Sequence, residues 1–580
     1  MRTPFRLVTM QDLVDATDVN RKVALDTETI GLYGKIRLLQ VYQQGWPEVL
    51  IVDSPNHLEV AAYVNRVDSV WHNAHYDLTT IAPRFCPKKF NDTFLLSRLA
   101  QPEHQEYSLD VVMQRVLGFD PYKKAGLNKT VLQKSDWSKS VLTQQQLEYA
   151  AIDVYYLFDV YSAVCHEEDS QSYRLDMSTL RSCLDFQVNG MPLDQDKLNA
   201  EYDNIIQQLK DIPWVTKGNG YTFVHGRHSI QMPFNPNSPL QVKQVLGLEG
   251  TSKQILAEQS VAHGNTEAAN VSKARSLRKL LNFVDKYIDS TRLEGKFKPS
   301  ARSGRLTSDD ENLQQIPRAL KKVFGTKEDR VIIFSDYAQL ELRTICAILG
   351  VTVMEKLFRA GEDLHGYVAS ILFGEDWTKA DRQVTKTYNF NLLYGGSVNM
   401  VLSILMTYGM YIEHRLATRH KTKWLNLFGE INKWQQECIA KWKKGRLYST
   451  PFGRQYKAKL MTDFMNIMNQ GAGAEVAKLA LHYFKPWLDE HHPDVKICNF
   501  IHDSFILDAP NDPAVYEPVA IKLAECMQEA WFQMSKLYKI KDLPMPVDVK
   551  VGHNWGDIED GKNIDWEFTL DPYKMYKEAA

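Results

Sequence analysis

The chain has 580 residues, of which 44% are hydrophobic and 24% charged, and this composition excludes a largely disordered protein. Its formal net charge of −2 at pH 7 excludes a polycation, so any surface for nucleic acid must be a local basic face. The seven cysteines contain no C-x-x-C pair, which argues against structural zinc and for a reducing compartment such as the cytoplasm. No apolar run reaches the ~18 residues that a membrane helix needs, so no membrane partner is expected.

The first part of the chain alternates strands and helices. Residues 22–55 contain three predicted strands, KVALDTET, LLQVYQQG and VLIVDSP. Helical stretches follow around 92–118 and 144–165, before the polar stretch EEDSQSYR at 167–174. This order predicts an α/β domain over residues 1–173.

The rest of the chain is predicted to be helical first and mixed later. Residues 174–300 are mainly helical, and the stretch RSLRKLLNFVDKYI within them is expected to present one apolar face made of Leu277, Leu280, Leu281, Val284 and Ile288. The stretch VIIFSDYAQLELRTICAIL, at 331–349, predicts a buried strand that runs into a helix. Residues 350–450 are helical and basic in patches, and residues 451–580 mix helices with strands.

The stretch FIHDSFILDAP, residues 500–510, sets His502 and Asp503 within an apolar run that is typical of a buried strand or hairpin. Burying an unpaired carboxylate costs several kcal/mol. Asp503 therefore needs a partner, which is either a basic side chain from elsewhere in the chain or a metal ion.

Acidic side chains recur in the first α/β domain. Asp26 and Glu28 lie two apart on a predicted strand, so both point to one face. Asp77 follows in HNAHYD, and YAAIDVYYL places Tyr149 and Asp153 one helical turn apart. Four converging carboxylates would hold two divalent metals, and their hard oxygen atoms favour Mg²⁺ or Mn²⁺. For D-x-E alone, a pair of solvated surface acids is the better interpretation, whereas the three elements together are much more specific.

These three elements resemble the D-x-E, N-x-x-x-D and Y-x-x-x-D motifs of the 3′→5′ proofreading exonuclease domain of the DnaQ-like superfamily, which has an RNase H-like fold. The resemblance implies that the four carboxylates hold metals and that Tyr149 orients the attacking water. It also implies that Leu32 lies against the terminal base and that Asn73 contacts the DNA.

A second pattern, DRQVTKTYNFNLLYGG, places Arg382, Lys386, Phe390 and Tyr394 four residues apart. On a helix each such step advances 400°, so the four side chains lie within about a 120° arc. The two glycines that follow predict the end of the helix. Cations beside aromatic rings suit a nucleotide, because phosphates pair with Arg or Lys and the base stacks on a ring. For this helix alone, buried core rings with solvated cations are an equal alternative.

Six stretches, in the order that the family has them, resemble family A DNA polymerases, the class of bacterial DNA polymerase I and its bacteriophage relatives. They are SGRLTSDDENLQQIP (303–317), SDYAQLELR, the R-x-x-x-K-x-x-x-F-x-x-x-Y-G helix, TPFGRQ (450–455), MNIMNQGAGAEVAKLAL (465–481) and IHDS. The resemblance implies a right-hand polymerase after an exonuclease domain at 1–173, with its parts at 174–300 (thumb), 301–349 and 446–580 (palm) and 350–445 (fingers).

The same resemblance assigns roles to single residues. Asp336 and Asp503 would hold two Mg²⁺ ions with the Tyr337 carbonyl as a further ligand, and Ser504 stands where the family usually has a Glu. Contacts with the incoming nucleotide are implied for Arg382, Lys386 (also catalytic), Phe390, Tyr394, His365, Glu341 and Gln339. Glu341 among them would crowd the sugar 2′ position and select deoxyribonucleotides. Contacts with DNA are implied for Arg305, Asn312, Gln314, Arg343, Asn466, Gln470 and His502.

The expected function is template-directed addition of dNTPs to a primer 3′ end, with 3′→5′ proofreading. The expected setting is the replicative polymerase of a bacteriophage, a monomer acting on primer–template DNA in the cytoplasm of a bacterial host. Because the exonuclease motifs begin by residue 26, no preceding 5′-nuclease domain is expected, and the short thumb region, about 185–300, predicts no processivity-factor insertion.

Two alternatives remain at this point. One is a DnaQ-like nuclease whose polymerase-like half is catalytically silent and only binds nucleic acid. The other is a polymerase-derived scaffold in a replication complex. The complete Asp336/Asp503 pair and the R-x-x-x-K-x-x-x-F-x-x-x-Y-G helix argue against the first alternative, which a primer-extension assay tests. Both acidic clusters would have no reason to be complete in the second.

Overall fold

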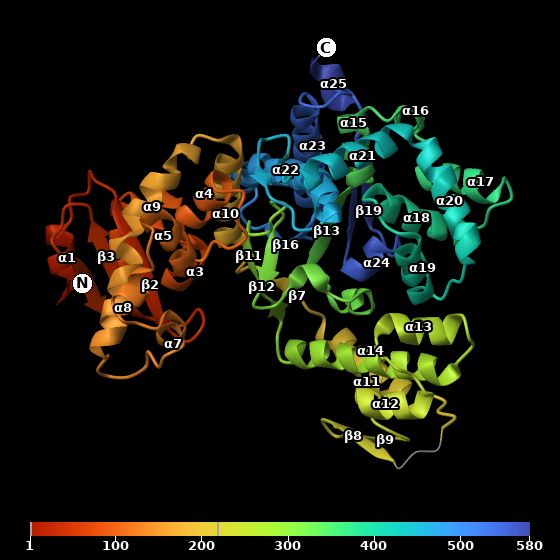
Figure 1. Ribbon diagram of the computed structural model, residues 1–580, viewed down its shortest axis with the longest axis horizontal. Helices are drawn as coiled ribbons and strands as arrows, with labels where there is room; N and C mark the ends of the chain where they lie inside the picture. The colour runs from red at the N-terminus through yellow and green to blue at the C-terminus, as the bar shows by residue number, and fades with distance from the viewer. Residues whose placement is uncertain (1–2, 217–219, 580) are drawn as a thin grey trace.

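The computed structural model describes residues 3–216 and 220–579 (Figure 1). An N-terminal α/β part lies at the left of the figure, a central sheet lies in the middle, and the helical region 352–443 lies at the right. A second helical region, residues 195–287, extends below the central sheet. The arrangement confirms the predicted mixture of an α/β part with an α+β part.

The N-terminal part is built on a six-stranded sheet with the order β1-β4-β3-β2-β5-β6. β3 runs antiparallel to both of its neighbours, and the other pairs are parallel. The strands are β1 Phe5–Val8, β2 Val23–Ile30, β3 Lys35–Gln43, β4 Val49–Asp53, β5 Ser69–Trp71 and β6 Phe90–Asp92. The three strands predicted within residues 22–55 are confirmed as β2, β3 and β4.

Helices surround this sheet. They are α1 Met10–Ala16, α2 His57–Arg66, α3 Ala74–Ile81, α4 Thr93–Ala100, α5 Leu109–Leu117, α6 Pro121–Lys124, α7 Lys129–Gln133, α8 Gln144–Tyr155 and α9 Leu157–Val164. The predicted helical stretch 92–118 is two helices, α4 and α5, separated by a loop. The loop begins at Gln101 because Pro102 lacks an amide hydrogen and disfavours a helical residue before it.

Helix α10 (Gln171–Phe186) joins the N-terminal part to the rest of the chain. Ser170 caps it by accepting a hydrogen bond from the Tyr173 amide. The helix packs against α3 and α4 on one side and against α22 (Met461–His491) on the other. The predicted domain boundary at residue 173 falls inside this helix, and the polar stretch EEDSQSYR contains its cap, Ser170.

The helical region after α10 has a buried stripe and one unpredicted hairpin. Its helices are α11 Gln195–Lys210, α12 Pro239–Leu246, α13 Lys253–Val261 and α14 Thr266–Tyr287. The predicted apolar face of α14 is confirmed at Leu277, Leu281 and Val284, which are buried. The prediction is wrong for Ile288, which follows the end of the helix and is 37% exposed, and Tyr287 is buried in its place. The helical interpretation misses the hairpin of β8 (Tyr221–His225) and β9 (His228–Met232).

The central sheet is antiparallel, with the strand order β16-β17-β13-β18-β19. Its strands are β13 Arg330–Tyr337, β16 Lys496–Ile501, β17 Ser504–Pro510, β18 Val547–Gly552 and β19 Trp566–Thr569. The strand-to-helix step predicted for 331–349 is confirmed, because β13 leads into α15 (Leu340–Leu349). The hairpin predicted for 500–510 is confirmed as β16 and β17. The helices that follow the hairpin are α23 Pro513–Ser535, α24 Trp555–Glu559 and α25 Lys574–Ala579.

Small two-stranded sheets connect these parts. They are β7 Met191–Pro192 with β10 Arg292–Leu293, β11 Lys296–Lys298 with β12 Thr307–Asp309, and β14 Tyr448–Ser449 with β15 Gln455–Tyr456. In Figure 1 the β11–β12 pair lies between the N-terminal part and the central sheet. This position brings its side chains within reach of both parts.

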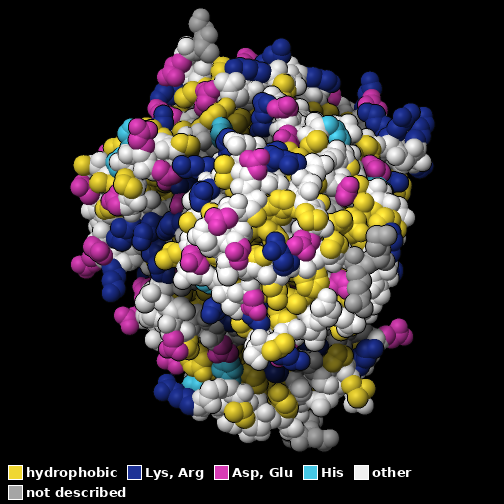
Figure 2. Space-filling view, turned by 90° about the vertical axis from the view of Figure 1, so that its left-hand side faces the viewer, with side chains coloured by type: hydrophobic (Ala, Val, Ile, Leu, Met, Phe, Trp, Pro, Cys, Tyr) yellow, Lys and Arg dark blue, Asp and Glu magenta, His cyan; other side chains and the backbone are white. Residues whose placement is uncertain are grey.

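The region at the right of Figure 1 is helical, as predicted for residues 350–450. Its helices are α16 Thr352–Ala360, α17 Leu364–Phe373, α18 Lys379–Leu393, α19 Val398–Thr407, α20 His414–Leu427 and α21 Gly429–Lys443. Across residues 3–216 and 220–579, no helix is both long and apolar enough to span a membrane. Figure 2 shows the side formed by the N-terminal part, where acidic and basic side chains are interspersed, in keeping with the small net charge.

Candidate active sites

Three carboxylates meet at the N-terminal sheet. Strand β2 supplies Asp26 and Glu28, and helix α8 supplies Asp153. One ligand oxygen of each lies within 4.8 Å of the others, an arrangement that suits a metal ion. The capping box of Thr143 and Gln146 fixes the start of α8, and with it the turn of the helix on which Asp153 lies.

Asp77, the fourth predicted carboxylate, is bound to the strand that carries the first two. It lies on α3, and its Oδ1 accepts hydrogen bonds from the Thr27 amide at 3.0 Å and from the Thr27 hydroxyl at 2.6 Å. Burial raises the pKa of Asp77 to about 7, and the Thr27 hydrogen bonds oppose this rise. Thr27 is a functional residue that the sequence analysis missed, although it stands in the middle of the D-x-E motif.

The electrostatics of this cluster favour a bound cation. Burial raises the pKa of both Asp26 and Glu28 well above the ordinary range, and the neighbouring carboxylates raise both further. Burial also raises the pKa of Asp153, to about 6. Lys129, on α7, opposes each of these rises without cancelling them. The donor set is therefore made of hard oxygen atoms short of positive charge, and it fits the predicted divalent metals.

Two tyrosines lie beside Asp153. Tyr149, predicted to orient water, lies beside this carboxylate, and burial and then the charge of Asp153 raise its pKa well above the ordinary value. Tyr122 donates a hydrogen bond to Asp153, and its ring lies 5.5 Å from the Lys129 ammonium. Tyr122 was missed because it lies outside the three motifs. Both hydroxyls keep their protons at neutral pH and stay available as donors.

The acidic cluster opens into a cavity of about 930 Å³. Leu32, which is 73% exposed after β2, and Asn73, at the start of α3, both line it. Tyr76 adds an aromatic ring to the wall. Lys298 and Ser300, from the β11 strand and the loop after it, line the same cavity. The cavity is therefore completed by a segment far from the α/β part in sequence.

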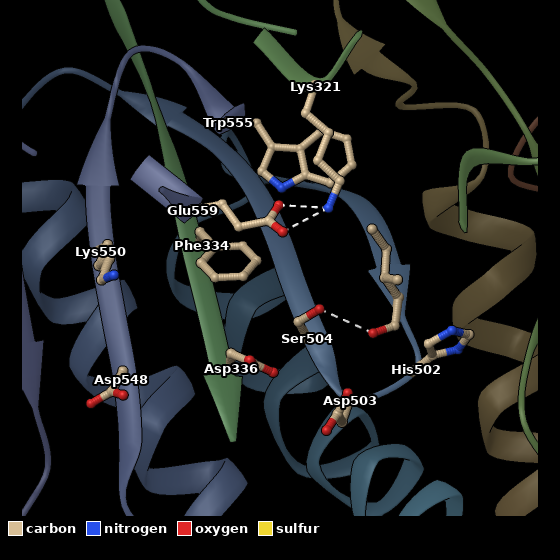
Figure 3. Close-up of a pocket in the computed structure, with 11 residues that line it drawn as sticks. Lys321, Phe334, Asp336, His502, Asp503, Ser504, Asp548, Lys550, Trp555 and Glu559 are labelled. Atoms are coloured by element: carbon tan, nitrogen blue, oxygen red, sulfur yellow. Dashed lines mark hydrogen bonds and ion pairs between the residues drawn. The ribbon is translucent and has the colours of Figure 1, made fainter. Parts of the chain in front are cut away.

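Asp336 and Asp503 face a second cavity, of about 320 Å³, in the central sheet (Figure 3). Asp336 lies near the end of β13, and Asp503 lies at the tip of the β16–β17 hairpin rather than inside a strand. His502 in that turn has a φ of 58°, the left-handed conformation that tight hairpin turns use. Burial and then the charge of Asp503 raise the pKa of Asp336 to about 8, and burial raises the pKa of Asp503 to about 6. This pair also fits a divalent cation.

The apolar stretch at 500–510 contains a second aspartate, Asp508, whose charge is compensated by two arginines. Asp508 is fully buried on β17 and pairs with Arg292 at 2.7 Å and with Arg330 at 2.5 Å. Asp503 has Arg305 as its neighbouring cation, but that guanidinium forms its ion pair with another carboxylate. The basic partner considered from the sequence thus belongs to Asp508, and a metal ion stays the expected partner of Asp503.

The wall of this cavity carries charges that the sequence analysis missed. Asp548 on β18 is the cross-strand neighbour of Asp336. Lys321 binds both oxygens of Glu559 at 2.7 Å and lies 4.6 Å from the centre of the Trp555 ring. Asp548 and Glu559 both add to the raised pKa of Asp336. These residues meet Asp336 only in the folded sheet, so no local pattern in the sequence marks them.

Ser504 and Tyr337 hold the backbone around the two aspartates. The Ser504 hydroxyl donates to the Ile501 carbonyl at 3.0 Å, which closes the turn that carries Asp503. The Tyr337 hydroxyl is buried and donates to the Met527 carbonyl at 2.8 Å. This contact anchors the end of β13, where the predicted carbonyl ligand lies.

The predicted stripe of cations and rings lies on α18, which starts with a capping box and ends just before Tyr394. The Arg382 guanidinium forms two hydrogen bonds with Asp363, at 2.6 and 3.0 Å, while Lys386 is exposed. Phe390 is half-buried between the cations and Tyr394. The helix and its end at the two glycines are confirmed.

His365 lies beside this stripe, as predicted. Its ring centre is 6.0 Å from that of Phe390, and Asn389 Nδ2 donates to His365 Nδ1 at 2.8 Å. Burial, and then the charge of Arg382, lowers the pKa of His365 to about 4. The imidazole is therefore neutral at pH 7, with its proton on Nε2, and it offers a hydrogen bond instead of a charge.

Glu341 connects the stripe to the palm carboxylates. Tyr394 donates its hydroxyl to Glu341 at 2.8 Å, and Arg305 binds the other carboxylate oxygen. Asn469 donates to the Tyr394 oxygen at 2.9 Å and to the Glu341 backbone carbonyl at 2.9 Å. Three predicted site residues are thus brought together, and Asn469 is one that the sequence analysis missed.

The other residues predicted to contact DNA differ in their exposure and in the hydrogen bonds that their side chains already make. Gln314 donates to the Phe500 carbonyl at 2.8 Å, and exposed Asn312 caps a short 3₁₀ turn. Half-buried Asn466 and Gln470 follow one turn apart on α22, and His502 is exposed at the hairpin tip. Gln339 begins α15 with a φ of 58°.

The structure differs from the prediction that Arg343 contacts DNA. Its side chain is buried, with 6% exposure, and its guanidinium donates to the Ala338 carbonyl at 2.9 Å and to the Pro544 carbonyl at 2.7 Å. It also lies 4.2 Å from the centre of the Phe358 ring. Arg343 therefore fastens α15 to the chain before β18 and is not placed to contact DNA.

Comparisons with known proteins agree with this geometry. The family described as DNA polymerase family A matches residues 225–557, more than half of the chain, and the family described as 3′-5′ exonuclease matches residues 2–167. DNA polymerase I of Aquifex aeolicus is 26% identical over 575 residues, covering 92% of this chain and 95% of the relative.

Other relatives match a smaller share. The thermostable DNA polymerase I of Thermus aquaticus is 27% identical over 366 residues, 56% of this chain and 42% of the relative. A DNA polymerase of Bacillus phage SP01 is 28% identical over 285 residues, 44% of this chain and 30% of the relative.

The fold also matches a solved structure. The POL domain of Pol1 from M. smegmatis, in complex with DNA primer-template and dNTP, superposes with a TM-score of 0.74 at 18% identity. The superposition covers 95% of this chain and 99% of that one. The chain therefore belongs to DNA polymerase family A and carries a 3′-5′ exonuclease domain in its N-terminal part.

Proposed function

We propose that the cavity of Asp336 and Asp503, called the palm cavity, adds dNTPs to the 3′ end of a primer paired with a DNA template. The cavity that the acidic cluster of Asp26 opens into, called the exonuclease cavity, removes nucleotides from that end by hydrolysis. The observation that carries the proposal is that both acidic sites are complete. The palm site has Asp336 with Asp503, and the exonuclease site has Asp26, Glu28, Asp77 and Asp153. The primer-template and dNTP named for the M. smegmatis structure support the choice of substrates.

Two divalent ions, Mg²⁺ by preference, would be held at each site by these carboxylates. When bound, such ions make the attacking oxygen more acidic and neutralise the charge that develops on the phosphate. The raised pKa values of the carboxylates support this assignment, because each site lacks positive charge of its own.

Helix α18, called the fingers helix, would bind the incoming nucleotide beside the palm cavity. Lys386 is exposed and free to pair with the triphosphate, and Arg382 is presented by its ion pair with Asp363. Neutral His365 would donate a hydrogen bond to a phosphate oxygen. Phe390 would pack against the sugar and base, and Glu341, held in place by Tyr394, would leave no room for a 2′-hydroxyl.

On the DNA side of the palm, Arg305, Gln314 and Gln470 would contact the minor groove of the new pair. His502, exposed beside Asp503, would contact the primer terminus. In the exonuclease cavity, Tyr149 would position the attacking water, Leu32 would lie against the terminal base, and Asn73 would contact the strand.

The domain assignment follows the elements. We place the end of the exonuclease domain before α10, the thumb on α11 to α14, the fingers on α16 to α21, and the palm on the central sheet with α15, α22 and α23. The relative from Bacillus phage SP01 supports a bacteriophage origin, in which the chain replicates phage DNA in a bacterial cell.

The experiment is primer extension on a labelled primer–template with Mg²⁺, with and without dNTPs. We expect extension with dNTPs and shortening of the primer without them, and EDTA should abolish both. The control is the Asp336→Asn variant, which should shorten primers but not extend them. Shortening without any extension by the unaltered chain would favour a nuclease with a silent polymerase half and would contradict the proposal.

A further inference from the structure

One short segment connects the two acidic cavities. Lys298 and Ser300 line the exonuclease cavity, and Arg305, further along the same segment, binds Glu341 beside the palm carboxylates. Eight extended residues span at most about 28 Å. The two cavities are therefore connected by one short stretch of chain.

Between the ends of this segment lies a basic hollow, at the seam between the exonuclease and palm parts. Its basic lining residues are Arg98, His104, Arg302, Arg454 and Lys457, and the described residues of the lining include no acid. Tyr107 lines both this hollow and the exonuclease cavity, so the two adjoin. The hollow has a volume of about 20 Å³, which is room for a single water molecule or one phosphate oxygen.

The buried member of the hollow has an unused donor. Arg454 is 4% exposed, and its Nη2 binds Asp176 at 2.6 Å. Its Nε finds no hydrogen-bond partner among the described residues. A buried guanidinium N–H is costly to leave without an acceptor, so the site is suited to an anion or a water molecule.

Only part of the positive charge around the hollow is balanced locally, since Arg454 has Asp176 and Glu475 as neighbouring carboxylates. Asp176 is shared between Arg454 and Lys478, at 2.6 Å from each. Within residues 3–216 and 220–579, neither Arg302 nor Lys457 forms an ion pair, and Arg302 reaches only the Gln105 carbonyl, at 3.4 Å. At the rim, Glu103 is already paired with His104 at 3.1 Å. Two exposed cations therefore face solvent beside the unused donor.

The hollow is held in shape across the seam. The Lys457 amide donates to the Pro102 carbonyl at 2.9 Å, and Gln105 Nε2 donates to the Lys457 carbonyl at 2.8 Å. The Arg98 guanidinium is fixed by the Ser300 carbonyl. These contacts join the exonuclease and palm parts, so the backbone that carries Lys457 and the Arg98 guanidinium keep their places without a ligand.

We propose that this basic seam, defined by Arg302, Arg454 and Lys457, binds a phosphate of the single-stranded primer end as it passes between the palm and the exonuclease cavity. The proposal rests on the proposed function and adds a binding site that neither active site needs for its own chemistry. A phosphate at the mouth of the hollow pairs with the two exposed cations, and the Arg454 guanidinium adds positive charge from inside the hollow.

The test uses the full chain with Arg302→Ala and Lys457→Ala combined. The matched control is Lys459→Ala, which removes an exposed lysine outside the hollow. A primer with a mismatched 2-aminopurine terminus reports, by fluorescence in EDTA, how many primer ends are unstacked in the exonuclease cavity. In a second assay, Mg²⁺ starts the reaction, and an excess of unlabelled DNA added with it limits each enzyme to one encounter with the labelled primer. The rate at which a variant excises the mismatch is then divided by the rate at which the same variant digests free single-stranded DNA.

We expect the double variant to lower this ratio at least about fivefold and to reduce the unstacked fraction, while Lys459→Ala changes neither. Two lost contacts should also make the salt dependence of single-strand binding shallower by about 1.4 in log–log slope. Replacing Arg302 by lysine instead of alanine, with Lys457→Ala kept, should restore part of the ratio. An unchanged ratio, or an equal fall with Lys459→Ala, would overturn the proposal. Failure of the unaltered chain to extend or digest DNA would instead overturn the proposed function.

Discussion

Tyr394 and Glu341 are joined by a hydrogen bond of 2.8 Å, which connects the end of the fingers helix to the first palm helix. Arg305 holds the other oxygen of the same carboxylate. The residue proposed to exclude a 2′-hydroxyl is therefore fixed from both sides. A fixed carboxylate can reject a substrate by its position, whereas a mobile one would move aside.

Glu341→Ala should weaken this selection. Removing the carboxylate opens space for a 2′-hydroxyl, so ribonucleotide use should rise in single-nucleotide kinetics while dNTP use falls less. Glu341→Gln, which keeps the volume, is the control and should stay selective. A parallel fall of rNTP and dNTP use would mean that Glu341 only supports Tyr394 and Arg305.

Phe390→Tyr should change the use of dideoxynucleotides. Phe390 has no hydroxyl, and a Tyr there would place one where a dideoxynucleotide lacks its 3′-hydroxyl. We expect discrimination against ddNTPs to fall by about tenfold or more, equivalent to roughly 1.4 kcal/mol. Phe390→Leu, which adds no hydroxyl, is the control. An unchanged ddNTP/dNTP ratio would show that Phe390 does not lie against the sugar.

The two activities should be separable. Asp26→Ala combined with Glu28→Ala removes two carboxylates of the exonuclease cluster and leaves the central sheet untouched. Primer shortening without dNTPs should fall by more than about 10³-fold, or roughly 4 kcal/mol of barrier, while extension stays within about twofold. Loss of extension as well would contradict two independent sites.

The sequence predicts local structure and motifs well, because strand alternation, helix caps and motif spacing are properties of neighbouring residues. It predicts the hairpin that carries Asp503, but it cannot tell that Asp508, five residues on, takes the arginine pair. Those arginines, Arg292 and Arg330, lie 216 and 178 residues away along the chain. The prediction for Arg343 differs from the structure for the same reason, since the Pro544 carbonyl that binds it lies 201 residues away along the chain.

Metal affinity of the exonuclease site should depend on pH. The pKa of Asp77 is raised to about 7 and that of Asp153 to about 6, so protons occupy the site as the pH falls through this range. Because metal binds the charged forms, affinity should rise between pH 6 and 7 by up to about tenfold for each proton displaced.

Mn²⁺ binding, followed by water-proton relaxation, checks this expectation. Asp336→Asn with Asp503→Asn restricts the signal to the exonuclease site, and Asp77→Asn added to that background should make the pH dependence shallower. An affinity that is constant from pH 6 to 8 would show that these carboxylates are not the ligands.

Asp503 and Ser504, neighbours in one turn, should differ widely in their effect on extension. Asp503→Ala removes a proposed metal ligand, so single-turnover extension should fall by more than about 10³-fold, equivalent to roughly 4 kcal/mol. Ser504→Ala removes one hydrogen bond, the 3.0 Å contact with the Ile501 carbonyl, which is worth about 1 kcal/mol. Its cost should stay below about tenfold. The Ser504 hydroxyl is used within the turn, so it acts on Asp503 only through the backbone. Equal damage from the two substitutions would show that Ser504 touches the metals or the substrate directly.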